Sequence, residues 1–149
     1  MKTITYFILI GLYTSMFGQT MGKQSVAQLE ESPAGSKILW FMDVVKGGEA
    51  ISDEVIKTKF APKLIEKMGL DELKNMITDL QQKEGVLLVY KAKREKVTQY
   101  KLKVKGKKSN QWFEMQFYFE ESRPYRLLGF TIDSVDGMEE GEPIYPTLN

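Results

Sequence analysis

Hydrophobic residues in the first half of the chain follow the spacing of a helix. One apolar face recurs at intervals of three and four residues, at Ile38, Phe41, Met42 and Val45. Ser32 followed by Pro33 predicts the start of this helix, because serine caps free amides and proline fits the first turn. Further helical stretches are predicted from Ser52 to Gly69, with a break or fresh start at Pro62, and from Asp71 to Gly85.

After Gly85 the period changes from about 3.6 to about two, which indicates strands. The expected strands are residues 86–92, 99–105, 111–120 and 126–133. Residues 99–105 alternate apolar residues with lysines, and the last two strands have one hydrophobic and one mixed face, which suits an antiparallel sheet. Since helices precede strands, the sequence predicts an α+β domain with its N-terminal helices packed on one face of a roughly four-stranded antiparallel sheet.

The N-terminus has the pattern of a secretory signal peptide. Lys2 precedes an apolar run that is too short to span a bilayer, and small residues follow it. We therefore expect a signal peptide at 1–18, with cleavage as late as 22, and a periplasmic or extracellular protein without a stable membrane span. A retained membrane anchor is the alternative.

The rest of the chain is expected to form one folded unit. Residues 19–32 are polar and predict a flexible lead-in. A single α+β domain then covers 33–135, and glycines, prolines and acids predict an irregular tail at 136–149.

The amino-acid composition excludes several kinds of covalent link and catalytic site. The chain has no cysteine and no histidine, which excludes disulfides and every catalytic triad that uses histidine. Its 21 basic and 20 acidic residues nearly balance, so net charge does not favour nucleic acid as a partner. The acidic stretch 133–140 lacks the calcium-loop pattern, because Val135 stands where an oxygen ligand is needed. We expect no cofactor and no metal site.

A family resemblance adds to this interpretation. The run from Phe41 to Gly48, the segment Phe60-Ala61-Pro62, and later Trp112 with Leu128-Gly129-Phe130 resemble the nuclear-transport-factor-two-like, cystatin-like superfamily. Within it, the chain looks most like small domains that accompany secreted bacterial serine hydrolases. The resemblance implies helices wrapped around a curved antiparallel sheet. The hydrolase activity does not carry over, since the chain has neither Ser-x-x-Lys nor Gly-x-Ser-x-Gly.

Two groups of residues are candidates for binding. Aromatic and apolar side chains on the sheet face away from the helices predict an interaction surface at Trp112, Tyr118, Tyr125 and Leu127. The alternative is that a helix or loop covers them as a second small core. Lysines between positions 91 and 108 predict a basic patch at Lys101, Lys103, Lys105, Lys107 and Lys108. The alternative is a solvated hairpin face whose lysines discourage edge-to-edge pairing.

Together these features favour an exported, non-enzymatic binding module for an unknown protein or small hydrophobic ligand. The mixed sheet face would also allow a homodimer. One alternative is a small enzyme or ligand carrier with a pocket between helices and sheet, using Tyr90, Tyr100, Asp43 or Glu114 as polar groups. Another is a partner of a separately encoded secreted hydrolase.

The signal peptide makes a direct prediction about processing. If it is cleaved, N-terminal sequencing of the exported protein should find a start at Gln19 or Lys23, because small residues precede both positions. Recovery of a protein that still begins at Met1 in the membrane fraction would instead favour a retained anchor.

Overall fold

The computed structural model describes residues 26–48, 50–137 and 141–146, which form five helices followed by a four-stranded sheet. The helices are α1 (Val26–Glu31), α2 (Pro33–Lys46), α3 (Asp53–Lys59), α4 (Pro62–Met68) and α5 (Leu70–Glu84). The strands are β1 (Leu87–Lys96), β2 (Gln99–Gly106), β3 (Trp112–Phe119) and β4 (Leu127–Ser134).

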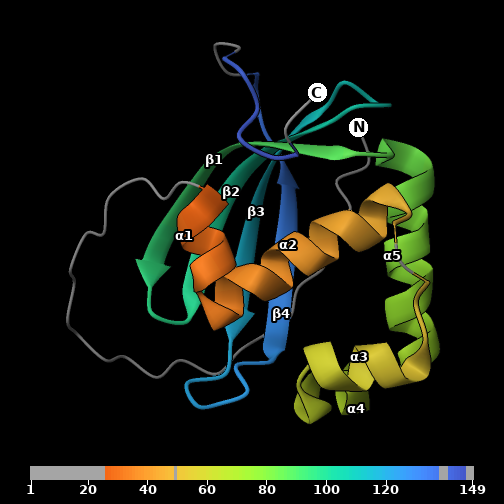
Figure 1. The fold of residues 1–149 in the computed structure, drawn as a ribbon. Helices are drawn as coiled ribbons and strands as arrows, with labels where there is room; N and C mark the ends of the chain where they lie inside the picture. Colours follow the sequence, from red (N-terminus) through yellow and green to blue (C-terminus); the bar gives the residue numbers. More distant parts are fainter. Residues whose placement is uncertain (1–25, 49, 138–140, 147–149) are drawn as a thin grey trace.

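The strands form an antiparallel meander in the order β1-β2-β3-β4. Figure 1 shows α2 crossing one face of this open sheet, with α1 over its β1–β2 side and α3 to α5 beside the β4 side. The predicted α+β class, with helices packed on one face of a four-stranded antiparallel sheet, is confirmed.

The helices begin where capping residues occur in the sequence. Ser32 Oγ accepts a hydrogen bond from the Gly35 amide at 3.2 Å, which caps α2. Ser52 caps α3 in the same way through the Val55 amide, also at 3.2 Å. Pro62 starts α4 as a separate helix, so the break expected there is a fresh start.

The core lies between α2 and the sheet. Phe41 of α2 is fully buried, with its ring centroid 5.6 Å from Phe117 of β3 and 4.9 Å from Phe130 of β4. On β2 the residues Tyr100, Leu102 and Val104 face the same layer and have no exposed surface. These contacts give one contiguous apolar core, which occupies the helix side of the sheet.

The lead-in expected to be flexible through residue 32 is instead helical over α1. Leu29 is fully buried, and it packs where α1 meets the first turn of α2. A single buried leucine gives no periodic signal, so helical spacing could not predict this six-residue helix. Residues 1–25, with the predicted signal peptide or anchor and the rest of the lead-in, lie outside the described residues.

Part of the tail predicted at 136–149 is held to the fold, namely residues 141–146. The Val89 amide donates to the Tyr145 carbonyl at 2.6 Å, and the Ile144 amide donates to the Val89 carbonyl at 2.6 Å. Tyr145 Oη donates to Asp43 Oδ1 of α2 at 2.6 Å. The segment therefore joins the outer edge of β1 to the helical layer.

Among the described residues, none of the helices has the length and apolarity needed to cross a bilayer.

The meeting of α1 and α2 makes a prediction for Gly35. In most helices Gly→Ala is stabilising, but a methyl group at Gly35 would lie 2.7 Å from Leu29 Cα, too close for two carbon atoms. We expect Gly35→Ala to lower the free energy of unfolding by about 1–3 kcal/mol, measured by chemical denaturation. Gly141→Ala is the control, since its methyl group would meet nothing within 4 Å. Equal stability of the Gly35→Ala variant and the unmodified protein would contradict this packing.

Candidate functional site

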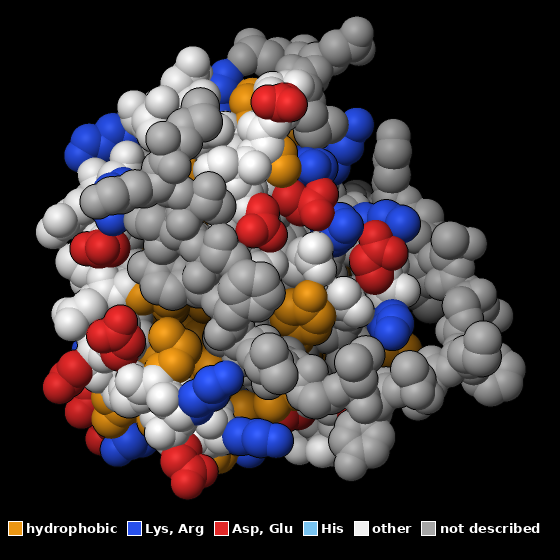
Figure 2. Space-filling view, turned by 180° about the vertical axis from the view of Figure 1, so that it is seen from behind, with side chains coloured by type: hydrophobic (Ala, Val, Ile, Leu, Met, Phe, Trp, Pro, Cys, Tyr) orange, Lys and Arg blue, Asp and Glu red, His pale blue; other side chains and the backbone are white. Residues whose placement is uncertain are grey.

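The sheet face away from the helices, which we call the open face, carries most of the predicted site residues. On β2 the half-buried Lys101, Lys103 and Lys105 alternate with the core residues, so their side chains point to the open face. Figure 2 shows the molecule from this side, where basic, acidic and hydrophobic side chains are all visible between the grey atoms. The β2 part of the open face therefore carries a row of charged side chains.

Lysines stand directly opposite one another on β1 and β2. Lys91 pairs with Lys103, and Lys93 pairs with Lys101. Like charges in directly opposite positions destabilise a sheet. Lys91 and Lys93 belong to the lysine-rich stretch of the sequence but were not part of the predicted patch. Lys93 lies beyond the strand end expected at residue 92, whereas β1 continues to Lys96. The basic residues at alternate positions 91 and 93 could have indicated a longer strand.

Glu114 of β3 offsets part of this repulsion. Its carboxylate oxygens lie 3.1 Å from Lys101 Nζ and 2.7 Å from Lys103 Nζ. The hydrogen bond from Lys103, joined by that from Lys101, lowers the pKa of Glu114 against the opposing effect of burial. One carboxylate thus holds two of the predicted basic-patch lysines.

Tyr118 continues the polar row along β3. Its hydroxyl donates a hydrogen bond to Gln116 Oε1 at 2.8 Å. Burial raises the pKa of the Tyr118 phenol, so it remains a neutral donor at ordinary pH. The predicted aromatic residue Tyr118 therefore does lie on the open face, half-buried and bonded to its neighbour.

Trp112 is on the same side but is covered. Only 6% of its surface is exposed, its ring lies 4.7 Å from that of Tyr90, and the Lys105 ammonium is 5.4 Å from its centroid. A side chain at Gly137 would touch the indole, 3.4 Å from Cδ1, so the chain after β4 passes against the ring. The expectation that Trp112 offers an exposed aromatic surface is wrong, and the alternative of a second small core describes it.

Leu127 does not lie on the open face, and Tyr125 lies outside the strands. Leu127 is 3% exposed and belongs to the main core, where it pairs with Phe119 across a register shift between Tyr118 and Phe119. This irregularity reverses the side on which Leu127 was expected. Tyr125 lies in the β3–β4 connection, which Lys37 of α2 holds by donating to the Pro124 carbonyl at 2.7 Å. The predicted four-residue surface is therefore not assembled.

The remaining basic-patch residues lie in the β2–β3 connection. Lys108 Nζ donates to the Gln82 carbonyl of α5 at 2.6 Å. Lys107 is exposed, and its amide donates a hydrogen bond to the Val86 carbonyl at 2.8 Å. The patch is thus divided between the β2 face and a hairpin end beside α5.

The four polar groups considered for an internal pocket do not converge. Tyr90 and Glu114 are on the open face, whereas Tyr100 and Asp43 are on the helix side. The Tyr100 hydroxyl is bonded to Ser32 Oγ at 2.9 Å. Burial, together with the hydrogen bond to Asp43, raises the pKa of Tyr145. The groups on the helix side are therefore already engaged in joining elements of the fold.

A hollow does exist, but on the outside of the helical layer. An open depression of about 470 Å³ lies between the end of α2 and α5 and includes Lys74 and Gln81. The Lys74 ammonium is paired there with Asp53 at 2.6 Å and Asp71 at 3.3 Å. Across the described residues, acidic side chains do not gather in a group that could hold a metal ion.

Known proteins give no further indication of the site. Comparisons of the chain with protein-family models, with curated proteins and with solved structures found no match. The resemblance to nuclear-transport-factor-two-like domains therefore remains a prediction from the sequence.

The Glu114 network makes a prediction about stability and pH. At neutral pH Glu114→Gln should reduce the free energy of unfolding by up to about 1 kcal/mol, because Lys101 and Lys103 lose their shared carboxylate. Since the folded-state pKa is lowered, this contribution is present above the ordinary carboxyl pKa and is lost as the pH falls through the folded-state value.

Denaturation at neutral and acidic pH measures this difference. Glu66→Gln on the exposed side of α4 is the matched control. It should leave the free energy of unfolding unchanged at both neutral and acidic pH. If the difference in free energy of unfolding between Glu114→Gln and the unmodified protein grew toward acidic pH, the sign derived for Glu114 would be contradicted.

Proposed function

We propose that this chain is an exported binding domain whose open face, at β1 and β2, binds an acidic partner protein. The single observation that carries the proposal is the pair of lysine rows, in which Lys91 faces Lys103 and Lys93 faces Lys101. The binding surface is thus the basic part of the open face rather than its aromatic part.

The lysine rows cost stability that the fold does not require. Directly opposed like charges on a sheet are unfavourable by roughly 0.2–1 kcal/mol for each pair. Glu114 and Glu95 offset part of this, since Lys101 and Lys103 share Glu114 and Lys93 lies 3.0 Å from Glu95. An acidic partner would relieve the remaining repulsion between the lysines, and this relief would contribute to the affinity of binding.

The chemistry of the face suits a protein more than a nucleic acid. Glu114 stands next to Lys103, and Asp133 follows it in the same row across the sheet. A phosphate backbone would be repelled by these carboxylates, whereas a protein surface can present acids to β1 and β2 and donors to β3. This mixture supports an acidic protein as the partner class.

The interior supports an external surface as the site of binding. Phe41, Phe117 and Phe130 fill the space between α2 and the sheet, and the buried residues described are apolar. By contrast, the ammonium group of Lys91 is available on the outside, because Lys91 is exposed and makes no ion pair within the described residues.

The test removes one lysine from each opposed pair. The protein without its predicted signal peptide would be titrated with fluorescently labelled poly-L-glutamate as an acidic probe, and binding would be followed by fluorescence anisotropy. In the double variant Lys91→Gln/Lys93→Gln, affinity should fall roughly fivefold or more, because two charge contacts are lost. The free energy of unfolding should stay the same or rise, because the like-charge pairs are relieved.

The matched control removes two charges from another surface. Lys63→Gln/Lys67→Gln changes exposed residues of α4 and keeps the net charge equal to that of the first variant. It should bind the probe nearly as well as the unmodified protein. Equal losses in both variants, or no binding by the unmodified protein at low salt, would refute the proposal.

A further inference from the structure

We infer that the outer edge of β1, from Lys91 to Lys96, binds an extended acidic segment of the partner as an added antiparallel strand. This inference rests on the proposed function and names how the partner is held. Its two components are main-chain hydrogen bonds at the edge and charge pairs with the lysines beside it.

The edge has main-chain groups placed to receive a strand. β1 is the first strand of the sheet, so one side of it has no neighbouring strand among the described elements. Val89 points its amide and carbonyl outward, because it bonds the C-terminal segment there. In an antiparallel ladder, the residues whose amide and carbonyl point away from the neighbouring strand recur at alternate positions. After the register shift between Val89 and Lys91, the residues of β1 that point these groups away from β2 are Ala92 and Arg94.

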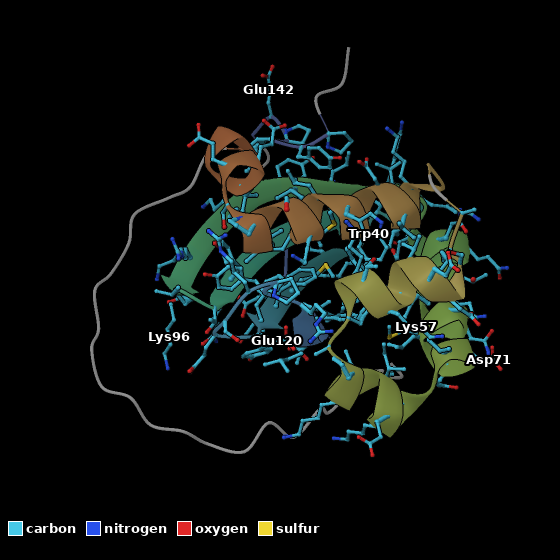
Figure 3. The ribbon with its side chains drawn as sticks, turned by 60° about the horizontal axis from the view of Figure 1, so that its bottom comes forward. Trp40, Lys57, Asp71, Lys96, Glu120 and Glu142 are labelled. Atoms are coloured by element: carbon cyan, nitrogen blue, oxygen red, sulfur yellow. The ribbon has the colours of Figure 1, made fainter. Side chains whose placement is uncertain are left out.

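The chain already places an extended segment on this edge. Tyr145 pairs with Val89 as an isolated antiparallel bridge, and the bonded segment follows an acidic stretch of sequence that includes Asp136 and Glu142. Figure 3 shows Glu142 on the side where this segment arrives and Lys96 at the other end of β1. The edge between them is the part that we assign to the partner.

Charge selects which strand can add. An incoming strand would place alternate side chains on the open face beside Lys91 and Lys93, where acids form favourable cross-strand pairs. A second copy of β1 in that position would bring lysines next to lysines. The same residues that discourage self-association therefore permit an acidic strand.

The probe is a capped octapeptide with glutamate at alternate positions and threonine between them. A second peptide of equal charge has proline in place of threonine, so it cannot donate the hydrogen bonds of a strand. Anisotropy measures affinity, and amide hydrogen exchange followed by NMR measures which main-chain groups are covered. At a threonine-peptide concentration about ten times its Kd, exchange at Ala92 and Arg94 should slow roughly tenfold, whereas the Lys91 and Lys93 amides, which face β2, should change little.

Charge variants complete the design. Lys91→Glu/Lys93→Glu should weaken binding of the threonine peptide about tenfold, because attractive pairs become repulsive. Lys63→Glu/Lys67→Glu makes the same change in net charge on α4 and should have little effect.

The outcomes separate this inference from the proposed function. Binding of both peptides with equal affinity and without protection of Ala92 and Arg94 would overturn strand addition but leave an acidic-partner surface. Failure of both peptides and of poly-L-glutamate to bind would overturn both. Protection of the two amides without peptide, together with a dimer in sedimentation, would show a second copy of the chain at the edge and would also overturn the inference.

Discussion

The position of Phe41 against Phe117 and Phe130 is the contact on which the rest of the structure depends. It fixes α2 to the centre of β3 and β4, and this commits one face of the sheet to the helices. Polar residues at the alternate positions of each strand then have to face the other way. The charged open face is therefore a direct consequence of where the aromatic core lies.

Most of the fold could be predicted from local patterns, whereas the site could not. Ser32, Ser52 and Pro62 mark helix starts through capping and backbone restriction, which are properties of a few adjacent residues. The side on which Leu127 lies depends on a register shift opposite it, and the burial of Trp112 depends on chain that returns from beyond β4. Both depend on tertiary pairing, which the spacing of residues along the sequence does not indicate.

The lysine-rich strands show how topology changes the meaning of composition. In sequence, positions 91–108 form a strongly basic stretch, but folding brings Glu114 between two of its lysines and places Trp112 under a third. What remains basic is the side of the open face nearest β1. The chemical character of the face is thus set by which strands are neighbours, and a local count of charges overstates it.

The bond between Tyr145 and Asp43 spans nearly the whole folded domain. Its two residues are 102 positions apart, and the helices and all four strands are synthesised before Tyr145 exists. Neighbouring strands of the meander can pair as they emerge, because each follows the previous one in sequence. Closure of the β1 edge near Val89 must wait for residues that follow the sheet, so a nascent chain exposes the outward amide and carbonyl of Val89 until Tyr145 has been made.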